Sequence, residues 1–236
     1  MKFGRHTDFD EDFLLQNMMG PNCVSIVEEL VRDVKLQPGA RVLDLGCGTG
    51  LTSVFLAREF GVQVFATDLW IDATENYARF RRLGLDGAIV PMHAEAHALP
   101  YARGYFEAVI SVDAWHYFGA DPTYLDEHIV PLVRPGGTIA VSVPGLQRDL
   151  VDGAVPEVLK PWWVDDMNFY SAKWWRNLWE QSPNIAVTQC FSHPCHAQAW
   201  RDWLRSPNPY AQRDIAMMEA EGGNYFDTIG IVAVVN

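Results

Sequence analysis

The feature that most constrains the fold is a glycine-rich turn, residues 46–50, set between an apolar run and a helix-forming segment. Residues 41–45 are short and apolar, as is typical of a buried strand. Residues 51–59 carry apolar side chains at helical spacing. A strand that passes through a tight glycine turn into a helix is the opening unit of an α/β sheet.

The alternation of strands and helices continues along the chain. Further strands are predicted at 62–67, 88–92, 106–112, 138–143, 185–190 and 228–235. Helices are predicted at 23–35, 73–83 and 124–133, and none is predicted in the first twenty residues. Short connections between alternating elements indicate an α/β fold with a doubly wound, mostly parallel sheet of seven strands.

Length and composition bound the organisation of the protein. The chain has 236 residues, of which 49% are hydrophobic and 20% charged, so we expect one globular domain over residues 1–236. No apolar stretch approaches the roughly 20 residues of a spanning helix. The N-terminal sequence is acidic and lacks the apolar core of a secretory signal. These features predict a cytoplasmic protein with no membrane partner.

Charge and cysteine content exclude further classes. The formal net charge of −12 would repel a phosphate backbone, so no nucleic-acid partner is expected. Four cysteines are too few and too unevenly spaced for a disulfide framework. The run from Cys190 to His196 includes Cys195 and His193, but its spacing does not fit a common zinc motif. No metal site is predicted, and the oligomeric state stays open.

The glycine turn also discriminates between nucleotide ligands. A dinucleotide fingerprint needs a third small residue where this chain has Leu51, and a phosphate loop needs a lysine after Gly50. Asp44 just before the glycines would repel a phosphate but suits an ammonium group. Asp68, at the end of the second strand, can accept both hydroxyls of a ribose. The pattern therefore favours an adenosine ligand with an amino-acid tail.

These motifs resemble those of the class I S-adenosylmethionine-dependent methyltransferases. The resemblance rests on residues 42–50, Asp68, residues 106–110 and residues 132–138, and it covers roughly residues 20–145. It implies a Rossmann-like fold whose last two strands form a C-terminal antiparallel hairpin. It also implies S-adenosylmethionine as cofactor and a small-molecule acceptor, as in the ubiquinone-biosynthesis-like group.

The resemblance implies cofactor contacts position by position. The methionine part would meet Asp44 and the glycine turn, the ribose Asp68, and the adenine Leu69 or Trp70 and the edge at Glu95 and Ala96. The full set of expected cofactor residues is Asp44, Gly46, Cys47, Gly48, Gly50, Asp68, Leu69, Trp70, Ala94, Glu95, Ala96, Asp113 and Ala114. The N-terminal segment, residues 1–21, is expected to cover the cofactor and exclude water.

Two residues after the fourth strand are candidates for catalysis. Residues 113–117 would line the methyl-donor end, where His116 could act as a base because imidazole titrates near neutral pH. Tyr117 is the second candidate. The alternative is that His116 only packs or binds the cofactor. The chain lacks the Pro-Pro motif that nucleic-acid amino-methylating enzymes carry here, which also disfavours a nucleic-acid substrate.

An aromatic-rich stretch, residues 145–182, interrupts the α/β pattern and is the expected acceptor or lid insertion. Together with Trp115, the candidate substrate contacts are Trp162, Trp163, Tyr170 and Trp174. Asp165 and Asp166 beside them would favour a cation. Trp175 and Trp179 are four residues apart and would share a helix face, so plain core packing is the competing interpretation.

Three functions therefore remain open. The leading hypothesis is a methyltransferase that acts on a small molecule by in-line displacement. The second is a lipid alkylation like that of cyclopropane-fatty-acid synthases, which only the aromatic stretch favours. The third is a cofactor-binding module without turnover.

Overall fold

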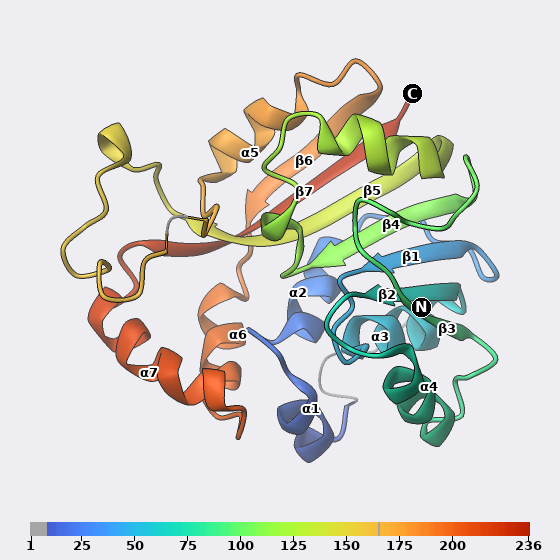
Figure 1. Ribbon diagram of the computed structural model, residues 1–236, viewed down its shortest axis with the longest axis horizontal. Helices are drawn as coiled ribbons and strands as arrows, with labels where there is room; N and C mark the ends of the chain where they lie inside the picture. Colours follow the sequence, from blue (N-terminus) through green and yellow to red (C-terminus); the bar gives the residue numbers. More distant parts are fainter. Residues whose placement is uncertain (1–8, 165) are drawn as a thin grey trace.

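A mixed seven-stranded sheet forms the centre of the protein (Figure 1). The computed structural model describes residues 9–164 and 166–236. The strand order is β3-β2-β1-β4-β5-β7-β6, with β1 to β5 parallel and β7 antiparallel to both β5 and β6. The strands are β1 Arg41–Leu45, β2 Gln63–Asp68, β3 Ile89–His93, β4 Phe106–Val112, β5 Val133–Leu146, β6 Ile185–Ser192 and β7 Phe226–Val235. The predicted doubly wound, mostly parallel sheet is confirmed.

Helices cover both faces of this sheet (Figure 1). They are α1 Glu11–Asn17, α2 Cys23–Leu30, α3 Leu51–Phe60, α4 Ala73–Arg82, α5 Ala172–Trp179, α6 His196–Trp203 and α7 Pro209–Glu221. All except α5 pack on one face, where they enclose one hydrophobic core. On the other face, α5 and short helical turns after β4 enclose a second core. Each strand therefore alternates its side chains between two cores.

Local sequence signals set the helix starts. Asn22 caps α2 by accepting hydrogen bonds from the amides of Val24 and Ser25, at 3.2 and 3.3 Å. Asp72 caps α4 through the amide of Thr74 at 2.7 Å. The α2 helix ends at Leu30 rather than at residue 35, because the chain turns at residues 31–33 on its way to β1.

Several predicted elements differ in the structure. The predicted helix 124–133 is a π-helical turn, Leu125–Ile129, followed by a 3₁₀ turn, Val130–Leu132. Pro131 has no amide hydrogen to donate, so a regular helix cannot continue there. The fifth strand is longer than predicted, and a bulge interrupts its pairing with β4 between Phe106 and Ala108.

The C-terminal strands pair antiparallel as predicted, but they are no simple hairpin. The α6 and α7 helices, which sequence analysis left unassigned, lie between β6 and β7. The α1 helix was also missed, because Met18 to Pro21 reads as a break and hides the seven-residue helix before it. Within the described residues, no helix is both long and apolar enough to cross a bilayer.

Candidate active site

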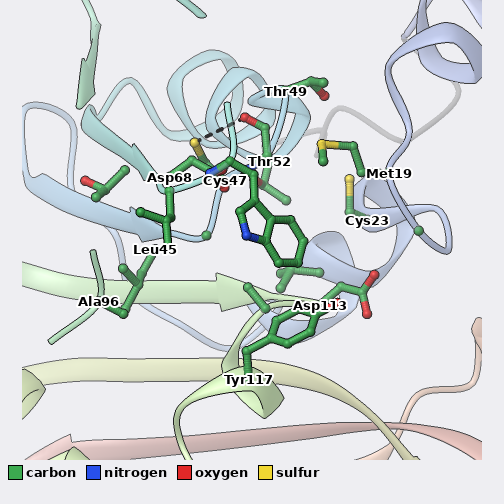
Figure 2. A pocket seen from close by; sticks show the side chains of 18 of the residues that line it. Met19, Cys23, Leu45, Cys47, Thr49, Thr52, Asp68, Ala96, Asp113 and Tyr117 are labelled. Carbon is green, nitrogen blue, oxygen red and sulfur yellow. Dashed lines mark hydrogen bonds between the residues drawn. The ribbon is translucent and has the colours of Figure 1, made fainter. Parts of the chain in front are cut away.

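A cavity of about 350 Å³ opens at the carboxyl edge of the parallel strands (Figure 2). Its walls come from the ends of β1, β2 and β4, the glycine turn, and residues 94–97 and 113–118. Asn17, Met19, Gly20, Pro21 and Cys23 close it from the N-terminal side. This edge is where α/β sheets bind ligands, because successive loops diverge there.

The glycine turn allows close backbone approach in two places. Gly46 has a φ of 71°, and a Cβ on it would lie 2.2 Å from the Cβ of Ala114. Gly50 has a φ of 84°, and a Cβ there would lie 2.4 Å from the Phe80 ring. A side chain at Gly46 would displace the loop after β4, and a side chain at Gly50 would displace helix α4. Gly50 is the N-cap of α3 and has no side chain, so the first backbone amides of that helix have no capping side chain as partner.

Asp68 holds the turn in place and faces the cavity. Its Oδ2 accepts a hydrogen bond from the Gly48 amide at 2.7 Å. Its Oδ1 accepts from the amides of Trp70 and Ile71 at 2.7 and 2.9 Å. Because each carboxylate oxygen has two lone pairs, Asp68 can still accept one further hydrogen bond, at Oδ2, from a ligand hydroxyl. It is fixed in orientation before any ligand arrives.

Asp44 lies elsewhere than expected. Its carboxylate is fully buried beneath α3, where Oδ2 accepts from the hydroxyls of Thr52 and Ser53, each at 2.6 Å. Burial raises the pKa of Asp44 to about 6. It does not line the cavity, and it acts on the site only by holding the start of α3, since Thr52 does line it.

The other expected cofactor residues line the cavity, with one exception. The lining set is Gly46, Cys47, Gly48, Asp68, Leu69, Trp70, Ala94, Glu95, Ala96, Asp113 and Ala114. Gly50 is outside it. Glu95 accepts hydrogen bonds from His97 through Nδ1 at 2.6 Å and through the amide at 3.0 Å, and this contact lowers the Glu95 pKa.

His116 and Trp115 do not line the donor end, contrary to expectation. The His116 ring is buried between Tyr117 and Phe169, and its Nδ1 has no partner among the described residues. Burial lowers the His116 pKa to about 3, so the ring is uncharged at neutral pH. Trp115 is fully buried in the second core against Trp179, with ring centroids 5.6 Å apart. The short 3₁₀ turn Trp115–Tyr117 directs these two side chains into the protein.

Tyr117 does line the cavity, and 56% of its surface is exposed. Its ring contacts that of Trp70 edge-on, with centroids 5.0 Å apart. Burial of the hydroxyl and the nearby carboxylates of Asp113 and Asp166 raise the Tyr117 pKa to about 12. The phenol is therefore protonated at neutral pH, which makes it a hydrogen-bond donor rather than a base.

The tryptophans of residues 145–182 pack against the cores rather than around the cavity. Trp175 and Trp179 are fully buried on one face of α5, which confirms the shared helix face. The four expected substrate contacts, Trp162, Trp163, Tyr170 and Trp174, are partly buried against the cores, and none lines the cavity. Asp165 and residues 1–8 of the expected covering segment lie outside the described residues.

Several cavity residues escaped the sequence analysis. They include Asn17, Met19, Gly20, Pro21, Cys23, Thr49, Leu51, Thr52, His97 and Phe118. Asn17, Met19, Gly20 and Pro21 fall in residues 1–21, which were expected to cover the cofactor, so the sequence indicated the segment but not the individual residues. The others face the cavity because α2, the glycine turn, α3 and the loops after β3 and β4 meet there.

A second polar cluster lies between α2 and the start of α6, and none of its members lines the cavity. Ligand atoms of Glu29, His193 and Cys195 lie within 4.8 Å of one another. The Glu29 carboxylate accepts from His193 Nδ1 at 3.1 Å and from the Cys195 amide at 3.2 Å. These hydrogen bonds tie the start of α6 to α2, so the cluster is explained as a structural network.

Comparisons with known proteins find similarity to methyltransferases. Residues 42–137 match the sequence model of the family described as a methyltransferase domain. Phosphoethanolamine N-methyltransferase 1 of Arabidopsis thaliana is 27% identical over 54% of this chain and 26% of its own length. The 2-methyl-6-phytyl-1,4-hydroquinone methyltransferase of Synechocystis is 30% identical over 69% of this chain and 43% of its own. The chain thus spans less than half of either relative.

A solved structure agrees at the level of the fold. The geranyl diphosphate C-methyltransferase of Streptomyces coelicolor, crystallised with S-adenosyl-L-homocysteine, superimposes with a TM-score of 0.71. The match covers 90% of this chain and 77% of that one, at 18% identity. Identity this low shows a common fold and nothing about the substrate.

Proposed function

We propose that this chain, in which residues 42–137 form a class I S-adenosylmethionine-dependent methyltransferase domain, transfers a methyl group to a small-molecule acceptor. The observation that carries the proposal is the 350 Å³ cavity that joins the glycine turn, Asp68 and the loop after β4 at one sheet edge. A cavity of this size suits a cofactor-sized ligand.

The residues present fit S-adenosylmethionine. Asp68 offers a preoriented carboxylate whose Oδ2 can accept a ribose hydroxyl. Leu51 and Thr52, in the uncapped first turn of α3, face the cavity and suit the carboxylate of the amino-acid tail. Leu69, Trp70, Ala94 and Ala96 offer apolar surface to the adenine, beside the Glu95 carboxylate. Asp44 and Gly50 serve this site by shaping α3 rather than by contact.

The chemistry divides simply between cofactor and protein. When bound, S-adenosylmethionine supplies a methyl group already activated on a sulfonium. The protein's residues then only need to align the acceptor and exclude water, and alignment can supply about 7 to 11 kcal/mol. Met19 to Pro21 close the cavity from outside and so exclude water from it. A cytoplasmic location stays a prediction from the sequence.

Calorimetric titration with S-adenosylmethionine, S-adenosylhomocysteine and NAD tests the proposal. We expect micromolar binding of the first two and none of NAD. Asp68→Asn should weaken binding by about tenfold or more, since a charged hydrogen bond contributes about 1.5–3 kcal/mol. Asp72→Asn, which alters only an exposed helix cap, is the matched control.

Two results would contradict the proposal in different ways. If neither adenosyl ligand binds, the assignment of the cavity fails. If both bind but no amine, phenol, thiol or lipid in a panel is methylated, the chain is a cofactor-binding module without turnover.

A further inference from the structure

Asp113 occupies an unusual backbone position at the end of β4. Its φ is 60°, in the left-handed region that few residues other than glycine adopt. The amide of Asp113 donates to the Ser142 carbonyl at 2.9 Å, so β5 holds it there. Strained backbone of this kind persists where the surroundings enforce it and is frequent at functional sites. At this position the backbone places the Asp113 side chain in the wall of the cavity.

This carboxylate has no partner within the described part of the chain. No hydrogen bond or ion pair to its oxygens is present, although the group is partly buried. Burial and the nearby Asp214 carboxylate raise the Asp113 pKa to about 7. The Asp113 carboxylate lines the cavity, so its oxygens are open to a ligand that donates hydrogen bonds.

Asp113 lies away from the ribose end of the cavity. Asp68 ends β2 and Asp113 follows β4, with β1 between them, so two strand spacings, about 10 Å, separate them. Figure 2 shows the Asp113 carboxylate beside Tyr117 and on the same side as Met19 and Cys23. A Cβ on Gly20 would lie 2.0 Å from Asp113 Oδ2, which places the carboxylate directly beneath the closing segment.

The cavity wall favours positive charge. Asp68, Glu95 and Asp113 contribute carboxylates, and no lysine or arginine lines the cavity in the described chain. The exposed rings of Trp70 and Tyr117 stand at the same wall and can stabilise a cation through their π faces. Phosphate or carboxylate groups on an acceptor would meet like charge at Asp68, Glu95 and Asp113.

We propose that the acceptors of this site are uncharged or cationic amines without acidic groups, and that Asp113 binds the amine nitrogen. This inference rests on the proposed function. The Asp113 carboxylate pairs with the ammonium and accepts one proton, which frees the nitrogen lone pair. That lone pair forms the new N–C bond, and the electron pair of the breaking S–C bond stays on sulfur, yielding S-adenosylhomocysteine. The methylated product leaves as an ammonium ion, and the proton held on Asp113 passes to water, so one proton is released for each ammonium acceptor methylated.

Matched acceptors test the proposal on the whole chain. The probes are phenethylamine and its N-methyl and N,N-dimethyl derivatives, with 2-phenylethanol, 2-phenylethanethiol and 3-phenylpropionate as isosteres. We expect S-adenosylhomocysteine to form with at least one amine and at least tenfold faster than with the isosteres. Asp113→Asn should lower kcat/KM for that amine about 100-fold while changing the Kd for S-adenosylhomocysteine less than threefold. Asp86→Asn, an exposed residue outside the cavity, controls for net charge.

Three outcomes would overturn the proposal without touching the methyltransferase assignment. The first is faster turnover of an alcohol, thiol or carboxylate. The second is that Asp113→Asn weakens S-adenosylhomocysteine binding by the same factor as it lowers kcat/KM, which would make Asp113 a cofactor contact. The third is methylation of a phenol or lipid acceptor with no amine methylated. Failure of the cofactor itself to bind would instead refute the proposed function on which the inference rests.

Discussion

At the residue scale, neighbouring side chains after β4 have opposite environments. Asp113 faces the cavity and has no side-chain partner among residues 9–164 and 166–236, whereas His116, three residues later, is buried between aromatic rings. The difference arises from the left-handed backbone of Asp113 and the 3₁₀ turn that follows. The His116 ring does not line the cavity, so we expect it to pack rather than to act as the base that the sequence suggested.

Replacing His116 with Phe tests this placement. The folded pKa, about 3, lies below the unfolded value of 6.5, so only the unfolded chain binds this proton between those values. The contribution of His116 to stability is therefore present above pH 6.5 and falls as the pH decreases. Between pH 7.5 and 5, wild type should lose about 2 kcal/mol relative to His116→Phe in urea unfolding. Turnover should persist, and a hundredfold loss at unchanged cofactor affinity would restore the base role.

At the element scale, the segment before α2 is part of the site. Thr49 donates its hydroxyl to the Asn17 carbonyl at 2.5 Å, and Arg79 Nε donates to Asn17 Oδ1 at 3.0 Å. From the other side, Ser206 and Asn208 donate to the carbonyls of Leu15 and Met18 at 2.7 and 3.2 Å. The segment thus bridges the glycine turn and the start of α7, above the cavity.

Ser206→Ala should loosen the segment before α2, although Ser206 itself does not line the cavity. The substitution removes the hydrogen bond to the Leu15 carbonyl and the one that the Asn208 amide donates to Ser206. Only the first contacts the segment, and losing about 1 kcal/mol there should raise the Kd for S-adenosylhomocysteine roughly threefold to tenfold. Amide exchange of residues 14–20 should accelerate while that of β1 and β2 stays unchanged. Ser182→Ala, which removes a hydrogen bond to Asp126 far from the cavity, is the control. Unchanged exchange and affinity in Ser206→Ala would show that the segment does not depend on α7.

At the scale of the whole molecule, the two cores have different tasks. The first core packs α1, α2 and α3 against the sheet and so carries the glycine turn and the closing segment. The second core holds Trp115, Trp175 and Trp179 at almost full burial. These tryptophans stabilise the sheet and present no surface to the cavity.

Trp179→Ala should therefore reduce stability without reducing cofactor affinity. Truncating a fully buried aromatic side chain costs about 3–5 kcal/mol, measured as the free energy of unfolding in urea. Trp174→Ala, whose partly buried ring stacks on Tyr170, should cost markedly less. A large loss of S-adenosylhomocysteine affinity in folded Trp179→Ala would place the second core in the site.

The sequence alone determined the alternation of strands and helices, the glycine turn and the position of Asp68. These features depend on neighbours a few residues apart, through periodicity, capping and backbone freedom. Only the tertiary structure decided that Asp44 lies beneath α3, that Asp113 and not His116 faces the cavity, and that the aromatic stretch packs inward. Those outcomes depend on contacts between segments far apart in the chain, such as Gly20 with Asp113 and Trp115 with Trp179. No local pattern encodes which face of a loop will be buried, because burial is set by what packs against it.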